Sequence, residues 1–107
     1  MIVRLWSART TSQLSSAYIE YFAQNVLPEL RALPGFLSAQ ILTTATATEI
    51  EILVQTIWQS WDSITAFAGP DRDSAVVHPA AAALLTTYDH RVRHFDLALS
   101  ASNSDSR

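Results

Sequence analysis

The chain has 107 residues, of which 49% are hydrophobic and 16% charged, and its formal net charge is −3 at pH 7. It contains neither Cys nor Lys, which excludes disulfides, thiolate metal sites and Schiff-base chemistry. Two glycines are too few for a phosphate-binding loop, and an acidic chain without a basic cluster argues against nucleic acid as a partner. We expect one domain with no membrane span and no signal peptide, and therefore a cytoplasmic location.

The first third of the chain predicts a strand followed by a long helix. Residues 2–8 are β-branched and aromatic with polar interruptions, which is typical of a strand. Apolar residues then recur at helical spacing and predict a helix over residues 12–32, with the hydroxyls of residues 10–12 as N-caps. Pro28 predicts a kink or a break near residues 24–27, and the Pro-Gly pair that follows ends the helix.

The rest of the chain predicts three more strands and two short helices. Residues 36–44 suit a second strand, and residues 49–59 alternate between two faces as a third strand. Ser60 is placed to cap a short helix that a Gly-Pro pair ends, and Pro79 can begin another helix. Residues 88–97 alternate again and predict a fourth strand.

This βαββαβ order predicts an α+β fold. We expect a ferredoxin-like domain over residues 1–97 with a four-stranded antiparallel sheet, followed by a polar tail at residues 98–107. Helices would cover one face of the sheet. The other face must also be covered, because the first strand directs Val3 and Leu5 to one side and Trp6 to the opposite side. We therefore expect a homodimer in which two sheets pack face to face.

Four segments resemble a known family: MIVRLW, PELRALPGF, IWQSWDSITAFAGPDRDSAVVHP and VRHFDL. Together they span nearly all of residues 1–97, and the third is typical of one branch of that family. The chain resembles the antibiotic biosynthesis monooxygenase family of dimeric α/β barrels. The resemblance implies the ferredoxin-like fold. It also implies either oxidation of electron-rich phenols or quinols by molecular oxygen, without metal or flavin, or binding and breakage of haem.

The haem-degrading members of that family use an Asn on the first strand, a Trp in the second helix and a His shortly after it. On this sequence the Trp position falls at Phe67, and the His position falls at or beside His78. The Asn position falls around Trp6 or Ser7, so two of the three residue types differ. The resemblance therefore favours haem binding, with His78 as the axial ligand, less than oxidation of a phenol.

His78 is the candidate catalytic base, because a neutral imidazole beside a pocket could take the proton of a phenol. Its simpler interpretation is a surface or capping residue before Pro79. Arg4 could stabilise an oxygen anion if it lines the cavity, although a buried ion pair in the dimer is an equal alternative. The candidate walls of a substrate pocket are Trp6, Phe22 and Phe67, each of which could instead be an ordinary core residue. The sequence leaves open which face of the first strand lines the cavity.

Two further patterns predict structure rather than chemistry. His90 and His94 have the spacing of a helical metal site, but on a strand they lie about 13 Å apart, too far to share a metal. A buried, hydrogen-bonded position in the sheet or the dimer interface suits His94 better. Ser60, Asp62 and Ser63 lack the surroundings of a nucleophile and are placed as helix caps.

Two classes of function follow. The first is a cofactor-independent monooxygenase that acts on a reduced aromatic of the phenol or quinol type, with no metal and no cofactor. The second is a dimeric small-molecule-binding module without turnover, or a haem-binding relative. Both classes need the same apolar pocket, so the sequence alone does not separate them.

Overall fold

The computed structural model describes residues 1–103, and its sheet is antiparallel with five strands. The helical elements are α1 (Ser15–Tyr21), a π-helical turn η1 (Phe22–Val26), α2 (Leu27–Arg31), α3 (Trp61–Ala68) and α4 (Pro79–Ala82). The strands are β1 (Ile2–Thr10), β2 (Phe36–Ala45), β3 (Ile50–Trp58), β4 (Thr87–Tyr88) and β5 (Arg93–Asp96). Strand order is β2-β3-β1-β4, and β5 also pairs with β1. The predicted ferredoxin-like α+β architecture is confirmed.

The predicted fourth strand is two short strands, which is a correction to residues 88–97. Both β4 and β5 lie antiparallel to β1, at its two ends. Between them the backbone bonds to a loop instead of the sheet: Ala75 N–H donates to His90 O at 2.9 Å, and Val92 N–H donates to Asp73 O at 2.8 Å. This competing pairing removes residues 90–92 from the ladder, whereas Asp89 N–H still donates to Ser7 O of β1 at 3.0 Å.

The long helix of residues 12–32 is continuous in space but irregular in its hydrogen bonding. It begins at Ser15, after a turn in which Thr11 Oγ1 accepts from Leu14 N–H at 3.2 Å. The π-turn η1 occupies residues 22–26, directly before Pro28. Proline has no N–H and its ring crowds the preceding turn, so the wider π-turn accommodates it. The kink or break predicted near residues 24–27 thus takes the form of a π-turn, and the helical segments follow one another without an interruption.

The short helices begin as predicted. Ser60 and Ser63 form a capping box at the start of α3, which ends at Gly69 with φ of +86°. Pro79 occupies the first turn of α4, preceded by the extended residue His78.

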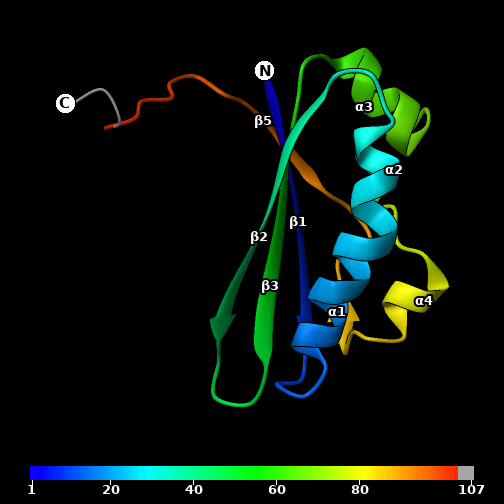
Figure 1. Cartoon of the computed structure of the whole chain (residues 1–107), viewed down its shortest axis with the longest axis vertical. Coiled ribbons are helices and arrows are strands. Elements are labelled where there is room, and N and C mark those ends of the chain that lie inside the picture. The colour runs from blue at the N-terminus through cyan, green and yellow to red at the C-terminus, as the bar shows by residue number, and fades with distance from the viewer. Residues whose placement is uncertain (104–107) are drawn as a thin grey trace.

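All the helices lie on one side of the sheet (Figure 1). The helix-facing side chains of β1 and β3 are buried in strict alternation. Trp58 is fully buried there, between the rings of Phe36 and Phe67 with centroids 5.5 Å away on each side. This layer of aromatic and aliphatic side chains between helices and sheet is the core of the domain.

The opposite face of the sheet carries no helix in the part of the chain that the structure describes (Figure 1). Strand register places six large apolar side chains on it: Val3, Leu5, Leu42, Leu53, Ile57 and Phe95. Leu42 and Phe95 are 48% and 40% exposed. The sequence expectation that both faces are apolar is therefore confirmed.

No helix of residues 1–103 is long and apolar enough to cross a membrane. The polar tail predicted at residues 98–107 has neither helix nor strand through residue 103, and residues 104–107 lie outside the described residues.

Candidate functional site

A cavity lies between the helices and the sheet. Its walls come from β1, β3, the α1–η1–α2 segment, α3 and residues 76–81. The lining residues are mostly apolar or aromatic: Arg4, Trp6, Tyr18, Phe22, Val26, Glu29, Leu30, Val54, Thr56, Phe67, Val76, Val77, His78, Ala81 and Val92. The cavity volume is about 70 Å³.

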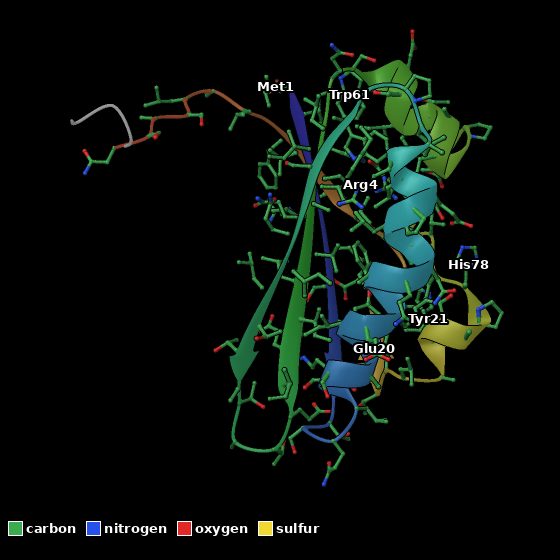
Figure 2. All side chains as sticks on the ribbon, in the orientation of Figure 1. Met1, Arg4, Glu20, Tyr21, Trp61 and His78 are labelled. Atoms are coloured by element: carbon green, nitrogen blue, oxygen red, sulfur yellow. The ribbon has the colours of Figure 1, made fainter. Side chains whose placement is uncertain are left out.

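Every candidate site residue from the sequence lines this cavity: Arg4, Trp6, Phe22, Phe67 and His78. The face of β1 that lines the cavity is therefore the inward one, which carries Arg4 and Trp6. In Figure 2, Arg4 points from the sheet toward the helices, and His78 lies on the helix side of the molecule.

The aromatic walls are held by specific contacts. Trp6 Nε1 donates a hydrogen bond to Asp89 O at 2.7 Å, which fixes the indole against the sheet edge. Its ring centroid lies 6.3 Å from that of Tyr18 on α1. Phe67 of α3 stacks on Trp58 with an interplanar angle of 29°. Phe22 is 8% exposed and enters the cavity from η1, where the π-turn widens the helix.

Arg4 is the one buried cation of the described cavity lining, at 4% exposure. Its Nη1 donates to Arg72 O at 2.5 Å and its Nη2 donates to Ser74 O at 2.8 Å. Its guanidinium also lies 5.5 Å from the centroid of Phe67, within cation–π range. Burial lowers the pKa of Arg4 to about 10, with the nearby Asp73 carboxylate opposing that shift, so the side chain remains charged at neutral pH.

His94 connects Arg4 to Asp73. Its Nε2 lies 3.1 Å from Arg4 Nη1, and its Nδ1 lies 3.0 Å from Asp73 Oδ1. Because a guanidinium has only donors, Nε2 must accept and Nδ1–H must donate, which assigns a neutral imidazole. Burial lowers the pKa of His94, the Arg4 charge lowers it further, and Asp73 partly offsets both. The sequence interpretation of His94 as a buried, hydrogen-bonded residue is confirmed.

His78 lies at the mouth of the cavity. Its side chain is 51% exposed, and its Nε2 lies 3.6 Å from Glu29 Oε1 on α2. His78 precedes α4 but makes no side-chain capping bond, so the capping interpretation has no support in this geometry. An accessible imidazole next to a carboxylate at the edge of an apolar cavity has the position of a proton acceptor.

The remaining sequence candidates lie outside the cavity. Ser60 and Ser63 bond to each other's backbone as caps, as predicted. His90 contacts the Tyr88 ring rather than His94. Within residues 1–103, no three His, Asp or Glu side chains gather closely enough to hold a metal ion.

Neither a protein-family model nor a curated protein matches the sequence. Several solved structures are similar over nearly the whole chain, and three of them are described below. The haem degrader MhuD of Mycobacterium tuberculosis, with two haems in its active site, is 22% identical with a TM-score of 0.61, covering 95% of this chain and 100% of MhuD.

A monooxygenase from the gene ActVA-Orf6 of Streptomyces coelicolor, in complex with Nanaomycin D, is 20% identical with a TM-score of 0.62, covering 94% of this chain and 92% of that one. SnoaB, a cofactor-independent oxygenase from Streptomyces nogalater, is 16% identical with a TM-score of 0.59, covering 92% and 95%. The chain has the antibiotic biosynthesis monooxygenase fold. The resemblance drawn from its sequence is thus confirmed at the level of the fold.

Three polar residues of this antibiotic biosynthesis monooxygenase fold escaped the sequence analysis: Tyr18, Glu29 and Thr56. Tyr18 has the spacing of a core-facing helix residue, and nothing in the sequence separates its hydroxyl from an ordinary buried ring. Glu29 follows Pro28 in the first turn of α2, directly after a π-turn for which ordinary helical spacing does not allow. Thr56 lies on the inward face of β3, where its Oγ1 accepts from Trp58 Nε1 at 2.8 Å.

Proposed function

We propose that this protein is a cofactor-independent monooxygenase for a reduced aromatic of the phenol or quinol type. The supporting observation is the composition of one cavity: three aromatic walls, a buried cation and an accessible histidine at its mouth. A flat apolar ligand suits the walls, and a group that becomes an anion suits the cation. Two solved structures of the same fold are described as oxygenases, one of them cofactor-independent.

The proposed roles follow from position. His78, half-exposed at the mouth, takes the phenolic proton and leaves an electron-rich anion that can reduce oxygen directly. The rings of Trp6, Phe22 and Phe67 hold the aromatic substrate. They also exclude water from the radical pair that forms when the substrate anion gives an electron to oxygen. Arg4 contributes a fixed positive potential rather than a free donor fork, because its terminal nitrogens already bond to two carbonyls and His94.

The cavity must open to admit such a ligand, because a polycyclic phenol needs several times about 70 Å³. The mouth residues are the ones able to move: His78 and Glu29 are 51% and 61% exposed, and Val76 is 39% exposed. The inner walls are closely packed against the sheet. We expect entry at the His78–Glu29 side.

Oxygen uptake by the metal-free protein with reduced anthrols and quinols tests this function. The variant is His78→Ala, and the matched control is His90→Ala, which removes a histidine outside the cavity. Protein-free buffer corrects for autoxidation. We expect uptake above buffer that falls at least tenfold in His78→Ala and stays unchanged in His90→Ala. Oxygen uptake equal to that of buffer across the panel would contradict the oxygenase function. Uptake that is unchanged in His78→Ala would contradict the role of His78 as the catalytic base.

We also propose that the working form is a homodimer packed through the open sheet face. Six large apolar side chains lie on that face, no described helix covers it, and a large exposed apolar surface usually marks an interface. Sedimentation at micromolar concentration should give a dimer, and Leu53→Asp should give a monomer. Ala47→Asp, in the exposed β2–β3 turn, adds the same charge away from this face and should remain dimeric. A monomeric wild-type protein would contradict the proposal.

Haem binding is the second candidate, because MhuD shares the fold and His78 is accessible at the cavity mouth. A Soret shift on haem addition that is lost in His78→Ala would favour it.

A dimeric binding module without turnover remains the alternative if a ligand copurifies unchanged and no oxygen is consumed. We place all three activities in the cytoplasm.

A further inference from the structure

The Tyr18 hydroxyl has an unusual environment. The side chain is 4% exposed and lines the cavity. No hydrogen bond joins its Oη to any other described residue, although within residues 1–103 every fully buried side-chain nitrogen or oxygen has a partner. The oxygen is therefore not fully buried. The open space beside this side chain is the cavity that Tyr18 lines.

The other well-buried polar groups of the cavity lining are already bonded. Arg4 bonds to two backbone carbonyls and to His94, and Trp6 Nε1 donates to a backbone carbonyl. Thr56 Oγ1 accepts the indole N–H of Trp58. Glu29 and His78 are exposed at the mouth, where both side chains are open to solvent. Tyr18 is thus the buried side chain of this lining whose donor remains available to a ligand.

The hydroxyl is also kept in its donating form. Burial raises the pKa of Tyr18 above its ordinary value, and the neighbouring Tyr21 adds to that shift. The phenol is therefore neutral throughout the physiological range and can donate a hydrogen bond. An apolar cavity with one free donor favours ligands with an acceptor at the matching position, because a ligand without one leaves the donor unpaired.

We propose that Tyr18 determines the specificity of this cavity by donating a hydrogen bond to an oxygen at the inner edge of the aromatic ligand. The ligand class is then narrower than flat aromatics: a phenol, quinol or quinone whose oxygen reaches Tyr18, and not a bare hydrocarbon. This inference rests on the proposed function for the identity of the ligand as an aromatic. It assigns to that site a recognition element separate from the base His78.

A packing role and a recognition role for Tyr18 predict different effects of the same substitution. If Tyr18 served only packing, phenylalanine would replace it without consequence for any ligand, since the hydroxyl bonds to no described residue. If it recognises an oxygen, Tyr18→Phe weakens oxygenated ligands alone. A neutral hydrogen bond corresponds to about three- to tenfold in affinity.

Equilibrium dialysis with three probes tests this: 1-naphthol, 1,4-naphthoquinone and naphthalene. The proteins are wild type, Tyr18→Phe and the control Tyr21→Phe, which removes a hydroxyl one turn away on α1 and outside the cavity lining (Tyr21 is labelled in Figure 2). We expect the wild type to bind one or both oxygenated probes about three- to tenfold more tightly than naphthalene. Tyr18→Phe should abolish that preference while keeping naphthalene affinity, and Tyr21→Phe should match wild type.

Three results would overturn the proposal: wild-type protein that binds none of the probes, equal preference in wild type and Tyr18→Phe, or an equal loss of all three probes in Tyr18→Phe. Failure of the oxygenase proposal looks different. Selective binding that depends on Tyr18, without oxygen uptake, would support the recognition role of Tyr18 and contradict the oxygenase reaction. Oxygen uptake with a probe preference that Tyr18→Phe does not change would support the oxygenase reaction and contradict the recognition role.

Discussion

Arg4 and His94 lie directly opposite each other on β1 and β5, with Nη1 and Nε2 3.1 Å apart. Two groups that can each carry a positive charge are thus in contact, and the contact is attractive only while the imidazole is neutral. Asp73 stabilises this arrangement from the other side of the ring, at 3.0 Å from Nδ1. The neutral state of His94 therefore supports three features together: the pairing of β1 with β5, the 71–74 loop and the position of the Arg4 cation.

The first prediction concerns pH. Burial and the Arg4 charge depress the pKa of His94 in the folded protein below its unfolded value near 6.5. The unfolded chain then binds more protons than the folded chain between those two values, so stability is complete above about pH 6.5 and is lost as the pH falls through the folded pKa. One proton contributes a slope of at most about 1.4 kcal/mol per pH unit.

Urea denaturation of wild type and His94→Gln from pH 7.5 to 5 measures this slope. Glutamine can accept from Arg4 and donate to Asp73 but does not titrate, so the variant should show the smaller loss at low pH. Comparing the two proteins cancels the contribution of the other titrating groups. Parallel curves would show that His94 is not linked to stability.

The second prediction concerns Arg4 itself. Arg4→Lys keeps the charge, but an ammonium cannot reproduce the planar fork that reaches Arg72 O, Ser74 O and His94 together. We expect a loss of about 1–3 kcal/mol of unfolding free energy, since buried acceptors are left unpaired. Hydrogen exchange in the 71–75 segment should also accelerate.

Arg9→Lys is the matched control, because Arg9 lies on the same strand with its side chain exposed. It should change the unfolding free energy by less than about 0.5 kcal/mol. Equal effects of the two substitutions would mean that the Arg4 contacts contribute nothing specific.

The third prediction compares the two glycines. Gly35 and Gly69 both have positive φ, +88° and +86°, so alanine is strained at either position. Only at Gly35 would the new methyl group meet a neighbour, 2.5 Å from Ser63 Cβ, whereas at Gly69 nothing lies within 4 Å. Gly69→Ala should cost about 1–2 kcal/mol and Gly35→Ala clearly more, by thermal or urea unfolding. A larger loss at Gly69 would refute the close approach of Gly35 to α3.

The fourth prediction concerns the buried pair Thr56 and Trp58. Thr56→Val removes the acceptor for a fully buried indole N–H, so we expect a loss of about 1–3 kcal/mol. Thr56→Ser keeps the oxygen and should recover part of that loss. Thr43→Val, on an exposed position of β2, supplies the baseline for the same change of side chain. If Thr56→Val and Thr43→Val shift the urea midpoint equally, the hydrogen bond has no net value.

The alternation of residues 49–59 and the capping sequence at Ser60 were sufficient to predict β3 and α3, because a strand's faces and a helix cap are decided by neighbouring residues. The same pattern on residues 88–97 was misleading. There the backbone of His90 and Val92 bonds to residues 73 and 75, and that competing partner leaves no mark in the local pattern.

By itself, the sequence determined the order of elements, the two apolar faces of the sheet, and a set of aromatic, Arg and His residues suited to one cavity. Only the tertiary structure decided that Arg4 and Trp6 face the helices, that Arg4 contacts His94 and through it Asp73, and that Tyr18 lines the cavity. The physical reason is the separation along the chain between the interacting residues. Periodicity and caps act within a few residues, whereas the partners of Arg4 lie 68 to 90 residues away and meet it only when the sheet closes.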